Sequence, residues 1–182
     1  MEQLAIDGRL KSAIAPLLAV LLDVNKQVAW LDSRIEHLVR SDETVGRLCS
    51  APSVGPVTAA AFASTIDEPD RFRGAHQVEA YLGLVPSEMS SGEKQRKGRI
   101  TKAGNGRLRS LLVQAALSIL RLRSPRTEVL RDWAERIAAR RGKKIAVVAL
   151  ARRMGGILYA MMRDGKPYQP ARPKLVSQAA AA

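Results

Sequence analysis

A regular apolar repeat near the N-terminus is the feature that most constrains how this chain can fold. The repeat advances by alternating steps of four and three residues through Leu10, Ile14, Leu17, Leu21, Val24, Val28, Leu31, Ile35 and Leu38. A 3.5-residue period keeps one stripe of a helix facing a partner, so the pattern predicts a coiled-coil helix over residues 1–40. A helix packed on its own domain is the alternative interpretation. Pro16 interrupts the pattern, and because an interior proline costs about 3 kcal/mol we expect a kink or a restart there.

The composition excludes several classes of protein. Hydrophobic residues make up 46% of the chain, which is enough for a buried core, while aromatic residues at 4% disfavour binding of single strands by base stacking. One cysteine and two histidines cannot form an intramolecular disulfide or a structural zinc site. No continuous apolar stretch approaches the ~20 residues of a membrane span, so we expect no membrane partner. Cysteine usage fits a reducing cytoplasm.

Positive charge is concentrated in the second half of the chain. Residues 1–90 carry 8 Lys/Arg and 12 Asp/Glu, whereas residues 91–182 carry 22 Lys/Arg and 5 Asp/Glu, so the net charge of +13 comes from the second half. Such an asymmetry indicates a segment that binds a polyanion, and DNA and RNA both satisfy it. An anionic membrane surface is less favoured, because the cations do not line an amphipathic helix with aromatic anchors.

The remaining pattern predicts an all-α fold. Helical periods, caps and glycine stops recur over residues 41–165: Ser41-Asp42-Glu43-Thr44 resembles a cap that opens a short helix, and Gly83 is placed to stop another. We interpret these residues as one compact helical domain, and no strand pattern is convincing. Residues 166–182 are rich in proline and alanine and are predicted to be a disordered tail. Within the domain, Pro52-Ser-Val-Gly55-Pro56 separates two short helices and resembles the turn of a helix-hairpin-helix motif. Gly55 would let backbone N–H groups approach a DNA phosphate, although a plain interhelical turn has the same pattern.

The segment from Gly83 to Asn105 carries the residues with the clearest chemistry. Ser90 and Ser91 stand beside Gly92, and glycine permits a close approach to a phosphate. Cations follow at Lys94, Arg96, Lys97, Arg99 and Lys102. Asn105 is placed to cap the next helix, whose first turns hold Arg107 and Arg109. We predict a basic serine loop that contacts nucleic acid through these cations, Asn105, Arg107 and Arg109.

A serine is a poor nucleophile unless its proton is removed and its charge is compensated. The sequence offers no evident Ser/His/Asp constellation near Ser90 or Ser91, which disfavours a protease or esterase. Arginine and lysine around a serine suit phosphoryl chemistry instead, because they neutralise the charge of the transition state. No acidic cluster has the character of a metal site.

Several ordered motifs together resemble one family. They are Leu48-Cys-Ser-Ala-Pro-Ser-Val-Gly-Pro-Val-Thr-Ala-Ala60, Tyr81-Leu-Gly-Leu-Val-Pro86, Ser90-Ser-Gly-Glu-Lys94, Gly98-Arg-Ile-Thr-Lys-Ala-Gly-Asn105 and Leu108-Arg-Ser-Leu-Leu-Val-Gln-Ala-Ala116. From about Leu48 to Pro170 the chain resembles the C-terminal transposase domain of the IS-one-ten type of bacterial insertion-sequence transposases, which are RNA-guided DEDD/serine recombinases. The resemblance implies strand cleavage and transfer through a covalent serine–DNA phosphodiester.

Site residues and cofactors follow from this resemblance. The family's Ser-Gly motif implies Ser91 as the nucleophile and Ser90 as the second candidate, while Lys94, Arg96, Lys97, Arg99, Lys102 and Arg107 would hold DNA or guide RNA. Family members also carry an N-terminal RuvC-like domain with four acidic metal ligands, joined through a coiled coil. This chain begins at that coiled coil, so we expect no cofactor here and Mg²⁺ only in the RuvC-like domain. Catalysis would need that domain.

The expected function is therefore DNA binding and strand transfer in insertion-sequence transposition. The partners would be DNA, guide RNA, and a second copy or a full-length transposase paired through the coiled coil. The alternative is a catalytically inactive, truncated transposase that binds nucleic acid and co-assembles with full-length partners. A weaker alternative is a DNA-repair adaptor that uses the turn at Gly55, and a preference for branched DNA would mark it.

Overall fold

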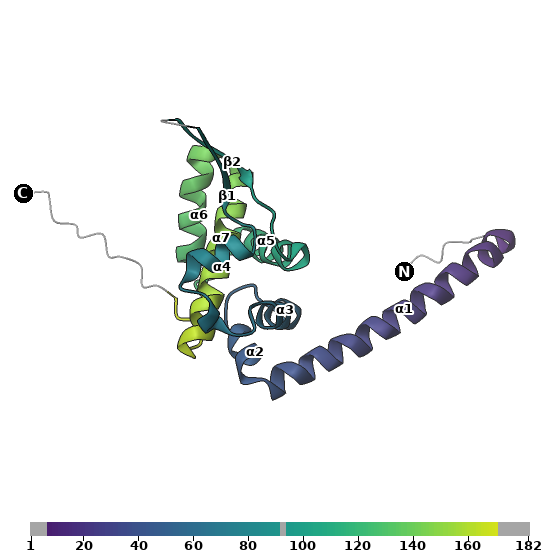
Figure 1. The fold of residues 1–182 in the computed structure, drawn as a ribbon. Helices are drawn as coiled ribbons and strands as arrows, with labels where there is room; N and C mark the ends of the chain where they lie inside the picture. The colour runs from purple at the N-terminus through teal and green to yellow at the C-terminus, as the bar shows by residue number, and fades with distance from the viewer. Residues whose placement is uncertain (1–6, 92–93, 171–182) are drawn as a thin grey trace, which may run out of the picture.

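The fold is a long helix that leads into a helical body from which a β-hairpin projects (Figure 1). The computed structural model describes residues 7–91 and 94–170. The elements in chain order are α1 Gly8–Ser41, α2 Glu43–Leu48, α3 Pro56–Ile66, the 3₁₀ turn η1 Pro69–Arg71, α4 Ala75–Tyr81, β1 Pro86–Ser91, β2 Lys94–Ile100, α5 Gly106–Arg121, α6 Glu128–Arg141 and α7 Lys143–Asp164.

The core of the body is organised around α7, which packs against α4, α5 and α6. Its inward positions, among them Leu150, Met154 and Leu158, are fully buried. The hydroxyl of Tyr159 donates to the carbonyl oxygen of Phe72 at 2.9 Å, which satisfies a polar group at the edge of this core. The mostly helical body agrees with the fold class predicted from the sequence.

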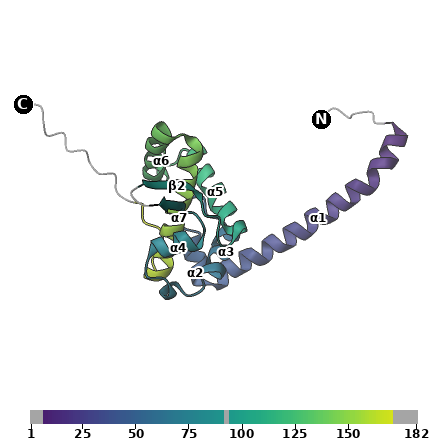
Figure 2. The ribbon, with the colours of Figure 1, turned by 45° about the horizontal axis from the view of Figure 1, so that its top comes forward.

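Helix α1 extends away from the body and contacts α2 and α3 at its C-terminal end (Figures 1 and 2). It runs as one helix through Pro16, so the expected restart does not occur. Figure 2 shows a bend in the N-terminal third of the helix, the part that holds Pro16, which is the local distortion a proline imposes. Six large apolar side chains of its repeat are exposed, namely Leu10, Leu17, Leu21, Val24, Val28 and Leu31, and Leu17 reaches 70%.

Two helices in the described part of the chain, α1 and α7, are long and apolar enough to cross a membrane by length and composition alone. In α7 half of the most apolar window is buried inside the body, as expected of a core helix. In α1 that window is not buried. The sequence criterion of a continuous apolar run did not detect α1, because Asp23 and Lys26 interrupt it.

The predicted basic loop is a two-stranded antiparallel hairpin, so the expectation of a purely α-helical fold was wrong at this point. Strands β1 and β2 contact each other and have few contacts with any other element. Ile100, the last residue of β2, packs against the core, but the residues before it in the two strands are mostly polar. The hairpin sequence therefore lacks the apolar alternation by which a half-buried strand is detected.

Local signals in the sequence predict where several of the helices start and stop. Asp42 caps α2 by accepting from the N–H groups of Thr44 at 2.8 Å and Val45 at 3.1 Å. Gly83 ends α4 at φ 67°, a conformation that favours glycine. After α7, the N–H of Tyr168 donates to Ser50 Oγ at 2.8 Å, so the first residues of the predicted tail return to the body. Residues 171–182 of that tail lie outside the described residues.

Candidate nucleic-acid interface

The two candidate serines lie at the outer end of β1, on the hairpin that rises from the body (Figure 1). The register places Ser91 opposite Lys94 and Ser90 opposite Gln95. Arg96 lies opposite Met89, and Lys97 lies opposite Glu88. Gly92, which belongs to the predicted Ser-Gly motif, lies outside the described residues. The hairpin therefore places the backbone of Lys94 directly across from that of Ser91. The loop predicted from the sequence did not imply this pairing.

Nearer the body the hairpin is shaped by an irregularity and a glycine. The register shifts between Pro86 and Glu88, as in a β-bulge, and such shifts bend and twist a ribbon. Ser87 Oγ donates to the carbonyl oxygen of Arg99 across the two strands at 3.0 Å. A Cβ at Gly98 would come within 2.6 Å of that hydroxyl oxygen, so the glycine leaves room for the bond. Arg99 itself is exposed.

The strand that returns to the body packs its backbone directly against the end of α4. The N–H of Lys102 donates to the carbonyl oxygen of Gly83 at 3.1 Å. A Cβ at Gly83 would lie 2.3 Å from the carbonyl oxygen of Ala103, and one at Gly104 would lie 2.1 Å from that of Tyr81. Both glycines have positive φ. The base of the hairpin is therefore a backbone-to-backbone contact that excludes side chains.

Lys102 takes a strained conformation within this contact. Its φ is 57°, in the left-handed region that costs a residue with a side chain about 1 kcal/mol. The side chain is exposed, so the ammonium group is available to a partner. Strain of this kind tends to occur at functional positions, which supports the prediction that Lys102 contacts nucleic acid.

Two predicted contact residues at the start of α5 form bonds inside the protein. Arg109 is half-buried, and its Nη1 donates to the carbonyl oxygens of Ala103 at 2.8 Å and Leu82 at 3.1 Å. Asn105 accepts from the N–H of Leu108 at 3.1 Å as the predicted cap, and its Nδ2 donates to Thr65 Oγ1 at 3.3 Å. Arg107 differs from both, because it is exposed and no hydrogen bond or ion pair of its side chain occurs among the described residues.

The turn between α2 and α3 lies apart from the hairpin. Thr65, near the end of α3, is bonded to Asn105, whereas Gly55 precedes the start of α3. A helix rises 1.5 Å per residue, so Gly55 lies about 15 Å from Thr65. The φ of Gly55 is −91° and the space around it is open, while the positive φ of this turn, 59°, belongs to Ser53. The turn itself therefore does not require a glycine at position 55.

The start of α3 is open to solvent-borne anions. Pro56 occupies the first helical position, Gly55 makes no side-chain cap, and the first turn holds no acidic residue. Helix N-termini with free N–H groups can bind phosphate, which is the property the helix-hairpin-helix interpretation uses. That interpretation remains a prediction, and the structure establishes only two short helices joined by a tight turn.

Sequence reasoning missed an ion pair that joins the buried Glu79 of α4 to the partly exposed Arg152 of α7. Glu79 is 8% exposed, and its Oε2 lies 3.3 Å from both Arg152 Nε and His76 Nδ1. His76 stays 94% exposed, as expected of a helix-surface residue. Spacing within α4 could have indicated the pair with His76, but Arg152 is 73 positions away and only tertiary packing brings it near. Across the described residues, no three His, Cys, Asp or Glu side chains gather in one place.

Comparison with known proteins identifies the class to which this fold and hairpin belong. Residues 45–130, which run from α2 through the hairpin and α5 to the first residues of α6, match the family described as "Transposase IS116/IS110/IS902 family". The chain belongs to this family of transposases.

Individual relatives agree with this assignment. A probable family 20 transposase of Pseudomonas aeruginosa is 32% identical over 163 residues, which cover 86% of this chain and 48% of the relative. The transposase for insertion sequence element IS1111A of Coxiella burnetii is 29% identical over 168 residues, 92% of this chain and 46% of the relative. An uncharacterized 43.6 kDa protein of insertion element IS110 from Streptomyces coelicolor is 30% identical over 175 residues, 95% of this chain and 42% of the relative. The chain spans a little under half the length of these relatives.

Proposed function

We propose that this chain binds DNA and takes part in DNA strand transfer during insertion-sequence transposition. The observation that carries the proposal is the projecting hairpin, which holds two serines and a run of cations within the part of the chain that matches the transposase family. A hairpin with few contacts to the body can reach a duplex that the helices do not touch. A two-stranded ribbon also has dimensions that the major groove of B-DNA admits.

The chemical step that we propose is attack of a serine on a DNA phosphate. The Oγ of Ser91 forms a bond to phosphorus as its proton leaves, and the bond from phosphorus to one deoxyribose oxygen breaks. That oxygen takes up a proton, and the serine keeps the phosphate as a phosphodiester. Attack by a second DNA hydroxyl reverses these bond changes and frees the serine. Ser90 is the second candidate for the nucleophile.

Cations around the hairpin would stabilise the charge that builds up on phosphorus oxygens. Lys94 pairs with Ser91 in the register, so it is the cation whose backbone lies directly across from the proposed nucleophile. Arg96, Lys97 and Arg99 continue along β2, and Lys102 lies at the base. We assign Arg109 and Asn105 to holding this base in place, because their polar groups are bonded within the protein. Mg²⁺ would be held by the four acidic residues of a RuvC-like domain, and no role on the hairpin is proposed for it.

Helix α1 supports a proposed partner, namely a second copy of the chain. Its apolar stripe is exposed over many turns, and exposed leucines at a 3.5-residue spacing gain most by packing against the same stripe of another helix. A full-length transposase with the same helix would pair in the same way. RNA remains a second proposed polyanionic partner, because a guide RNA satisfies the charge pattern as well as DNA does.

The experiment that tests the proposal is a search for a covalent protein–DNA adduct. The chain is incubated with labelled DNA that spans an insertion end, together with a full-length family transposase that supplies the RuvC-like domain and whose own candidate serines are replaced by alanine. The DNA carries a sulfur leaving group at the scissile phosphate, which departs without a proton donor. Label that stays with the protein on a denaturing gel reports the adduct. We expect the adduct for the unaltered chain and for Ser90→Ala, and its loss for Ser91→Ala.

Two outcomes would change the conclusion. An adduct that survives when Ser90 and Ser91 are both replaced by alanine would show that neither serine is the nucleophile. Binding of DNA without any adduct would favour the second candidate function, a nucleic-acid-binding protein that co-assembles with other transposase chains, for which the exposed stripe of α1 is the supporting observation. Preference for branched DNA, with no dependence on the insertion end, would instead favour the repair adaptor.

A further inference from the structure

The turn between α6 and α7 carries a dense group of cations that the proposed serine chemistry does not use. The α6–α7 cationic turn consists of Arg136, Arg140, Arg141, Lys143 and Lys144. All five side chains are exposed. The sequence contains no Asp or Glu from position 136 to position 163, so no acid close in sequence offsets them. None of the five forms an ion pair with another described residue.

Charge is segregated along α6 itself. In its first half Arg131 lies 3.9 Å from Asp132 and 3.8 Å from Glu135, so that cation is partly neutralised. In its second half Arg136 and Arg140 are one helical turn apart and carry like charge, an arrangement that destabilises a helix by a few tenths of a kcal/mol. The contrast shows that the turn concentrates charge, whereas an ordinary solvated helix face intersperses both signs.

The chain reversal adds to this concentration. Gly142 has a φ of 87° and separates the two pairs of cations, so that the end of α6 and the start of α7 bring them to one end of the body. Lys143 and Lys144 begin a helix that has no acidic residue in its first turn and no side-chain cap. Cations at a helix N-terminus are unfavourable by about 0.3–1 kcal/mol each, and an anionic partner would remove this cost.

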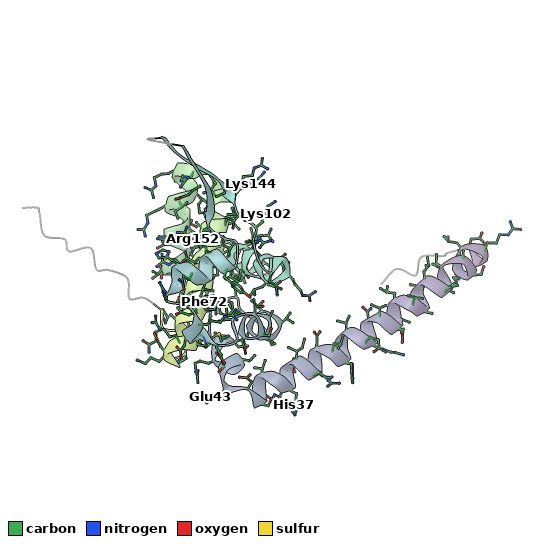
Figure 3. The ribbon with its side chains drawn as sticks, in the orientation of Figure 1. His37, Glu43, Phe72, Lys102, Lys144 and Arg152 are labelled. Atoms are coloured by element: carbon green, nitrogen blue, oxygen red, sulfur yellow. The ribbon has the colours of Figure 1, made fainter. Side chains whose placement is uncertain are left out.

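The position of the turn relates it to the hairpin. Figure 3 labels Lys144 and Lys102 toward the same end of the body, the end from which the hairpin rises in Figure 1. Ile145, at 44%, is the one large apolar side chain of residues 136–145 that is strongly exposed. A membrane surface would need several apolar anchors, so the turn favours a partner recognised through charge alone.

We propose that the α6–α7 cationic turn is a second nucleic-acid contact, which binds the sugar–phosphate backbone of a duplex. This backbone belongs either to a duplex that neighbours the one bound by the hairpin or to a more distant part of that same duplex. Phosphate contacts of this kind position a nucleic acid without reading its sequence. The contact does not depend on which serine reacts, or on whether either does.

The test compares two variants that lose equal charge. In the turn variant Arg140, Arg141, Lys143 and Lys144 are all replaced by glutamine. In the control variant Arg9, Lys11, Lys26 and Arg40 of α1 are replaced by glutamine. This control also loses two arginines and two lysines, all from exposed positions outside the turn. Glutamine is a good helix former, so both variants should fold. Affinity for a short DNA duplex and for an RNA duplex of the same sequence is measured across a salt series.

We expect a weaker salt dependence for the turn variant. The magnitude of the slope of log affinity against log salt concentration should fall by about 0.9 for each lost contact with B-DNA, that is by up to about 3.6. The control variant should keep the slope of the unaltered chain. The duplex with the larger change in slope identifies whether DNA or RNA is the partner. Urea unfolding of the turn variant should show no loss of stability, because like charges have been removed.

Equal slopes for the turn variant and the control would overturn the proposal, as would a loss of binding to anionic vesicles with duplex binding unchanged. The outcome is separate from that of the adduct experiment. If the Ser91 adduct forms while the turn variant binds normally, the second contact alone is wrong. If the slope falls while no adduct forms, the serine chemistry alone is wrong.

Discussion

Nη1 of Arg109 lies 2.8 Å from the carbonyl oxygen of Ala103, and the same nitrogen donates to the carbonyl oxygen of Leu82, the C-cap residue of α4. One guanidinium group on α5 therefore joins the segment that returns from the hairpin to the helix that precedes the hairpin. The relationship explains how a ribbon with few contacts of its own is fixed at its base. It also divides the predicted nucleic-acid contacts into two groups. One group is exposed and available to a partner, and the other is bonded within the protein and holds the site in place.

Arg109 and its neighbour Arg107 should separate these two roles. Arg109→Gln should lower the free energy of unfolding by about 2 kcal/mol, because hydrogen bonds from a charged group are lost and two carbonyls lose a donor. Arg107→Gln, at an exposed site, should change it by less than about 0.5 kcal/mol but weaken DNA binding. Urea unfolding and a DNA-binding titration on both variants check this. Equal losses of stability would show that Arg109 is not a structural clamp.

Lys102→Gly should have the opposite effect to Arg109→Gln, because it should weaken DNA binding without lowering the free energy of unfolding. Glycine removes the strain of a φ of 57°, so the free energy of unfolding should stay unchanged or rise by up to about 1 kcal/mol. Affinity for DNA should fall, since the cation is gone. Urea unfolding and a binding titration on the same sample give both quantities. Unchanged affinity would remove Lys102 from the interface.

Sequence reasoning selected Gly55 for close approach to a phosphate, but the structure excludes a side chain far more strongly at Gly83. Gly83→Ala should cost about 3 kcal/mol or more, because it combines left-handed strain with a Cβ 2.3 Å from the Ala103 carbonyl oxygen. Gly55→Ala should cost less than about 1 kcal/mol, since the space around Gly55 is open. Thermal or urea unfolding of the two variants checks the order. A larger cost at Gly55 would contradict the geometry of both turns.

How far the sequence predicts the structure depends on whether a signal is local. Caps and stops such as Asp42, Asn105 and Gly83 act within a few residues, and the structure confirms all three. The hairpin could not be predicted, because its strands are mostly polar and so carry no apolar alternation in the sequence. The bonds of Arg109 and the pair formed by Glu79 and Arg152 arise from packing between distant segments, which no local spacing reports.

Two adjacent leucines of α1 provide a matched test of the coiled coil. Leu21 lies in the apolar repeat and is 54% exposed, while Leu22 lies outside it and is 61% exposed. If α1 pairs with a second copy through the repeat, Leu21→Asn should raise the dimer dissociation constant at least about tenfold, which corresponds to 1.4 kcal/mol. Leu22→Asn should change it much less. Sedimentation equilibrium measures both, and a monomer at all concentrations would contradict the proposed partner.

The most direct measurement locates the DNA on the protein. After reaction with DNA that carries the sulfur leaving group, the chain is digested with nuclease and with trypsin, and the peptide from Gly74 to Lys94 is sequenced by mass spectrometry. This peptide contains Ser87, Ser90 and Ser91, so the unmodified serines serve as internal controls. We predict a nucleotide phosphate on Ser91. A phosphate on Ser87, on a residue outside this peptide, or on no residue at all would contradict the assignment of Ser91 as the nucleophile.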